Sequence, residues 1–190
     1  MIPFHGKKLV IGLVCILLFF QPPLAYCQDA KLKNIIVTNT RDDLLIYLTV
    51  DGAFTEKMES AVLSGVPASF SFFINLYRTR SFWFDKEIVA LKITHTIKYD
   101  NLKNEYIIRR SWDENSPKIV KSFAEAKKIM TEIDSLNVVP LNRLEKGTRY
   151  QIRTKAQLSK LTLPFYLHYV FIFVSLWDFE TDWYTIDFIY

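Results

Sequence analysis

Cysteine is nearly absent from this 190-residue sequence, and glycine is scarce. Both cysteines, Cys15 and Cys27, lie in the N-terminal segment. Residues 28–190 therefore have no thiol, which excludes internal disulfides, cysteine nucleophiles and metal sites with sulfur ligands. The few glycines beyond residue 27 are too widely separated to form a glycine-rich phosphate-binding loop.

Charge of one sign is not in large excess either. Lysine and arginine total 24 against 20 aspartates and glutamates, a net charge of +4. This balance argues against a strongly basic nucleic-acid binder. Half of the residues are hydrophobic, so the chain is not disordered, and its length predicts a single domain with a sizeable core.

Residues 1–27 have the three-part layout of a secretory signal peptide. The pair Lys7-Lys8 precedes the apolar run Leu9–Phe20, and Ala25-Tyr26-Cys27 resembles a cleavage site. The run is shorter than the roughly 20 residues that span a bilayer as a helix. We predict export to the periplasm and cleavage after Cys27. Two alternatives remain open: an uncleaved segment that tethers the protein to the inner membrane, and a lipid on Cys27.

Most of the chain after residue 27 alternates apolar and polar residues, as half-buried β-strands do. The predicted strands are residues 33–38, 44–50, 70–77, 89–99, 105–112, 138–144, 150–158 and 183–190. Long alternating segments with few helices predict a mainly β domain over residues 28–190. We expect an antiparallel β-sandwich, with helices packed at its ends or over one open face.

Three segments depart from this alternation and predict helices. The first runs from Thr55 to Ser64 and the second from Ser122 to Leu136, where Ser122 and Glu125 have the spacing of a capping box. The third runs from Pro164 to Leu176 and is apolar on every side. We interpret it as a buried helix, although its composition also fits a buried strand.

Catalytic and metal-binding patterns are missing from the sequence. His95 and His168 lie in apolar surroundings and lack metal-binding spacing, which is typical of core histidines. No serine has the glycines of a nucleophile elbow, and the paired carboxylates lie where turns are expected. We therefore predict no catalytic residue, metal site or cofactor. A hydrolase that uses one of the two histidines is kept as an alternative.

The segment from Tyr77 to Asp85 combines aromatic side chains with arginines. In an extended strand Arg78 and Arg80 project from one face, and continued alternation places Phe82 and Phe84 beside them. Such a face suits stacking and bidentate contact with carboxylate or phosphate groups. We predict partner binding by these four residues. The alternative is an ordinary strand end, with rings that cap the core and charges that face water.

Five segments of the chain resemble, in the same order, the bacterial domain of unknown function 4390. They run from Tyr77 to Asp85, Ile93 to Arg110, Ser122 to Lys128, Gly147 to Pro164 and Trp177 to Phe188. The family has no assigned activity, so the resemblance implies no catalytic or cofactor residue. Its members are often encoded near membrane sensor kinases, which implies an envelope signalling partner.

Two functions compete most closely. The first is a non-enzymatic periplasmic domain of the cell envelope that binds an envelope protein or another envelope component. The second is a small outer-membrane β-barrel, indicated by aromatic alternation in the last strand, where Tyr184, Phe188 and Tyr190 share a face. The predicted helices at Ser122 and Pro164 argue against the second function, so we favour the first.

Overall fold

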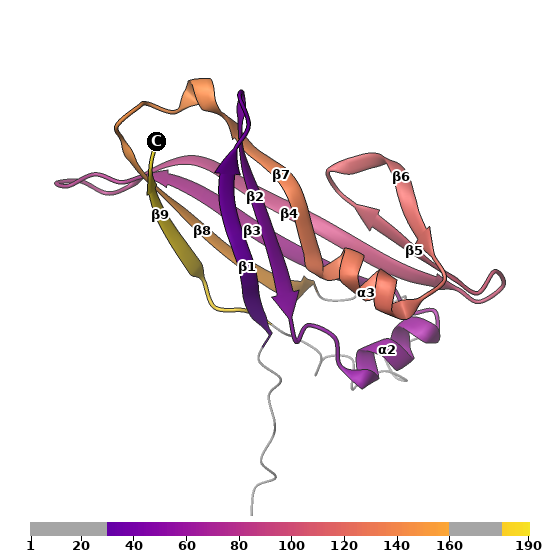
Figure 1. Ribbon diagram of the computed structural model, residues 1–190. Helices are drawn as coiled ribbons and strands as arrows, with labels where there is room; N and C mark the ends of the chain where they lie inside the picture. The colour runs from indigo at the N-terminus through magenta and orange to yellow at the C-terminus, as the bar shows by residue number, and fades with distance from the viewer. Residues whose placement is uncertain (1–29, 160–179) are drawn as a thin grey trace, which may run out of the picture.

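The computed structural model describes residues 30–159 and 180–190, in which the strands form two antiparallel sheets (Figure 1). The smaller sheet has the order β1 (Lys31–Asn39), β2 (Asp43–Asp51), β7 (Glu132–Pro140). The larger sheet has the order β6 (Asp113–Val120), β5 (Glu105–Arg110), β4 (Lys86–Asp100), β3 (Ala68–Arg78), β8 (Arg149–Ser159), β9 (Tyr184–Ile189). The described helices are α2 (Glu56–Leu63), α3 (Phe123–Thr131) and the short 3₁₀ helix η1 (Leu141–Arg143). The prediction of a mainly β, sandwich-like architecture is confirmed.

The core lies between the inner faces of the two sheets. Every second side chain of the central strands is buried, as the alternating sequence predicted. These side chains form one cluster, which includes Leu44, Ile46, Leu48 and Val50 of β2 and Phe70, Phe72, Ile74 and Leu76 of β3. Full burial of each large apolar side chain contributes about 1.5–3 kcal/mol, so these two rows account for much of the packing that holds the sheets together.

Helix α2 follows the prediction closely. Its N-cap is Thr55, whose hydroxyl accepts a hydrogen bond from the Met58 backbone N–H at 3.2 Å. Met58, Ala61 and Val62 are buried. The helix ends at Leu63 with Ser64 as its C-cap, because Gly65 has a φ of +86°, a conformation that glycine adopts easily and other residues rarely do.

The second predicted helix is wrong in its extent. Helix α3 ends at Thr131 and β7 begins at Glu132, so Ile133 and Leu136 lie on a strand and pair with β2. Apolar residues at helical spacing also fit an irregular buried strand, and β2 offers an edge that such a strand can join. Ser122 is the N-cap but makes no side-chain capping hydrogen bond, so the predicted capping box does not form.

Strand β6 has no counterpart among the predicted strands. Its residues include Asp113-Glu114, a carboxylate pair of the kind found at turns and strand ends, and Pro117, which an edge strand tolerates; pairing with β5 holds them in a strand. The predicted helix from Pro164 to Leu176 lies outside the described residues. Among the residues that are described, no helix has the length and apolarity of a membrane span.

Candidate functional site

The connection between β3 and β4, residues 79–85, projects from one end of the larger sheet (Figure 1). It carries three consecutive aromatic side chains that hardly touch the domain: Phe82 is 98% exposed, Trp83 75% and Phe84 89%. We call these three residues the aromatic tip. Large rings are usually at least partly buried, and neighbouring exposed rings mark an interaction surface more often than isolated ones do.

The base of the aromatic tip is fixed by contacts with β8. The last paired residues of the hairpin are Arg78 and Lys86, after which the Thr79 N–H donates to the Arg149 carbonyl oxygen at 3.0 Å. The carboxylate of Asp85 accepts from the Arg80 N–H at 3.4 Å and pairs with Arg153, also at 3.4 Å. The domain therefore presents the rings from an anchored base.

The structure separates the four predicted binding residues into two groups. Arg80, Phe82 and Phe84 lie in the exposed loop, whereas Arg78 belongs to β3, is half-buried and forms an ion pair with Glu145. The predicted alternation stops at Arg78, because the chain must turn before it pairs again in β4. Sequence reasoning placed Trp83 on the opposite face and left it out of the site. Its position between two other rings, before a second alternating segment, was the available sign of a loop.

The outer face of the larger sheet carries a second group of rings and cations, around Phe73 and Tyr77 of β3. Lys92 and Lys155 lie over the Phe73 ring at 5.5 and 5.6 Å, and Arg153 lies over Tyr77 at 4.8 Å. Lys155 also pairs with Glu180, and Arg153 with Asp85. These contacts already use the cations, so this face stabilises the sheet rather than presenting free groups.

His95 is a core residue, as its sequence pattern predicted. It is completely buried, and its Nδ1 donates to the Met130 carbonyl oxygen at 3.0 Å. The ring lies between Phe72 and Trp112, with centroid distances of 4.9 and 4.6 Å. Burial lowers the pKa of His95 from 6.5 to about 4, so the imidazole is neutral at pH 7. The other predicted core histidine, His168, lies outside the described residues.

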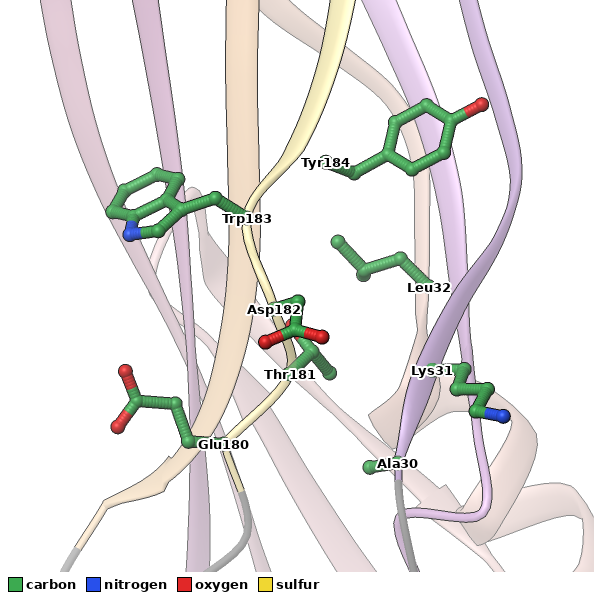
Figure 2. Close-up of a pocket in the computed structure, with 8 residues that line it drawn as sticks. All are labelled: Ala30, Lys31, Leu32, Glu180, Thr181, Asp182, Trp183 and Tyr184. Carbon is green, nitrogen blue, oxygen red and sulfur yellow. The ribbon is translucent and has the colours of Figure 1, made fainter.

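A cleft of about 360 Å³ lies between β1 and β9 (Figure 2). Figure 2 shows Leu32 and Tyr184 facing each other across it, while Trp183 points away to the other side of β9. The Thr181 hydroxyl accepts from the Ala156 N–H at 3.0 Å, and Glu180 is held by Lys155.

Over residues 30–159 and 180–190 we find no group of three histidine, cysteine or carboxylate side chains placed to hold a metal. The aromatic tip is therefore the strongest candidate for a functional site.

Comparison with protein families places the chain in a known group. The chain belongs to the family described as Domain of unknown function (DUF4390), whose model matches residues 27–187. The resemblance seen in the sequence is thus confirmed. Comparisons with curated proteins and with solved structures find no match.

Proposed function

We propose that this chain is a non-enzymatic binding module of the bacterial cell envelope, and that it engages its partner through the aromatic tip. The observation that carries the proposal is the exposure of Phe82, Trp83 and Phe84 on an anchored loop. Tryptophan, tyrosine and arginine are enriched among the few residues that supply most of the binding energy at interfaces, and Arg80 precedes the three rings by two positions. Three rings that stay exposed to water contribute no burial free energy to the folding of the domain.

A binding role is also favoured over catalysis by what surrounds the titratable groups. His95 is enclosed in the core and neutral at pH 7. Two carboxylates at the base of the tip, Asp85 and Glu145, are paired with arginines in the manner of structural groups. General acid–base chemistry needs a group that reaches its substrate, and neither His95 nor these pairs offers one.

The envelope location rests on the N-terminal sequence. A positive pair, a short apolar run and a cleavage-site pattern direct the chain to the periplasm. The partner is then a component of the envelope, and the gene neighbourhood implied by the family resemblance favours a membrane sensor kinase. Retention of residues 1–27 would keep the domain at the inner membrane surface, within reach of such a partner.

Site-specific crosslinking in living cells tests this function. A photoreactive residue replaces Trp83 in one strain and Leu102 in another. Leu102 is 95% exposed in the β4–β5 turn, at the opposite end of β4, and is therefore a matched control (Figure 1). We expect envelope adducts, protein or lipid, from position 83 and few from position 102. Equal labelling at both positions, or none at position 83, would contradict the proposal.

A further inference from the structure

We propose that the aromatic tip binds the surface of an anionic membrane, with its rings at the headgroup level and its neighbouring cations on lipid phosphates. This inference rests on the proposed function and names the partner of the same site. It has two independent supports, the form of the apolar surface and the charge around it.

The form of the tip fits a fluid interface better than a shaped protein groove. Phe82, Trp83 and Phe84 are consecutive in a loop, and none of them is more than about a quarter buried by the domain. A protein groove binds rings that share one face of a strand or helix. A bilayer interface, in contrast, accommodates rings that point in several directions. Tryptophan and other aromatic side chains concentrate at the headgroup level of membranes.

The charge around the tip complements anionic lipids. Asp85 is neutralised by Arg153, and Glu145 by Arg78. Within the described part of the chain, Arg80, Lys86 and Arg149 have no carboxylate partner, and all three are exposed. Glu87 of β4 and Asp187 of β9 are exposed carboxylates without an ion pair among the described residues near the same end of the sheet, so the three cations outnumber them. The unpaired charge at the base of the tip is therefore positive, and cations next to inserted rings strengthen binding to anionic headgroups.

The experiment measures binding of the purified, processed protein to two kinds of vesicle. One is phosphatidylcholine alone; the other is phosphatidylcholine and phosphatidylglycerol in equal parts. We expect sedimentation with the anionic vesicles and little with the neutral ones. Replacing all three rings, F82S/W83S/F84S, should lower the partition coefficient at least ~10-fold. The control L102S, which removes an equally exposed apolar side chain elsewhere, should leave it unchanged.

Two further variants separate the contributions of charge and ring. R80A/K86A should weaken binding to the anionic vesicles severalfold and reduce its sensitivity to salt. W83F should keep most of the binding but lose the blue shift of tryptophan emission that insertion of Trp83 produces. Melting temperatures should match that of the unmodified protein, because every substituted residue is exposed.

The outcomes distinguish this inference from the function on which it rests. Failure of the unmodified protein to bind anionic vesicles, or unchanged binding by F82S/W83S/F84S, overturns membrane docking. If position 83 nevertheless gives protein adducts in cells, the binding module stands and its partner is a protein. Absence of both vesicle binding and adducts contradicts both proposals.

Discussion

We expect the buried imidazole of His95 to make the stability of this domain sensitive to mild acid. The N–H at Nδ1 of His95 is satisfied by the Met130 carbonyl, but Nε2 has no hydrogen-bond partner in the described structure. Protonation would place a charge at Nε2, between Phe72 and Trp112 and near the Arg110 guanidinium. Burial first, and Arg110 second, therefore hold the pKa of His95 down at about 4.

The direction of the pH effect follows from this depressed pKa. Between pH 6.5 and about 4 the unfolded chain binds a proton at His95 that the folded domain does not, so acid favours unfolding. Lowering the pH from 7 to 5 should reduce the free energy of unfolding by about 2 kcal/mol through this residue. Urea unfolding at the two pH values measures it. In H95N, whose amide can still donate to the Met130 carbonyl, this part of the difference should disappear; an undiminished difference would assign it to other groups.

Trp83 shows where residue-level prediction reaches its limit. The sequence correctly indicated an unusual concentration of rings and arginines from Tyr77 to Asp85. The three consecutive rings indicate a loop, but they do not indicate the residue at which the pairing of β3 stops. The end of β3 is set by its neighbours: Thr79 bonds to β8, and Asp85 closes the loop on Arg153. Those contacts join residues distant in sequence, and no local pattern encodes them.

At the scale of elements, the two helix N-termini offer a matched comparison. Thr55 caps α2 through its side chain, whereas Ser122 at the start of α3 makes no such bond. T55A should lower the free energy of unfolding by about 1 kcal/mol, and S122A by no more than a few tenths. Denaturant titration of both variants measures the difference. Equal losses would mean that Ser122 caps α3 in solution.

The strands were more predictable than the boundary between α3 and β7. Alternation in β2, β3, β4 and β8 identified both the strands and their buried faces. A period of two that is sustained over nine or more residues fits a half-buried strand and does not fit a helix. From Ile129 to Leu136 the apolar spacing fits either a helix or a bulged strand. Pairing with β2, where the register shifts twice, decides in favour of the strand after Thr131. The boundary therefore depends on pairing with a strand whose residues lie more than eighty positions earlier in the chain.

At the scale of the whole molecule, the N-terminal segment makes a definite prediction about the mature protein. Cleavage after Cys27 should leave a chain that begins at Gln28, and intact-mass analysis of the envelope protein measures this. Because that chain has no cysteine, reductant should leave its unfolding midpoint unchanged. A mass that includes residues 1–27, or a lipid on Cys27, would instead indicate a membrane-tethered form.

The strand order of the larger sheet also constrains the order in which its strands can pair during folding. β3 gains β4 as soon as their hairpin closes, but its other neighbour, β8, follows α3 and β7 in the chain. Pairings between distant segments form slowly, because a long loop must close before any contact rewards it. Until β8 pairs with it, β3, which supplies many of the core side chains, is an open edge that other chains can join. We therefore expect loss of this protein to aggregation to depend on the lifetime of the sheet without β8 as well as on the stability of the folded domain.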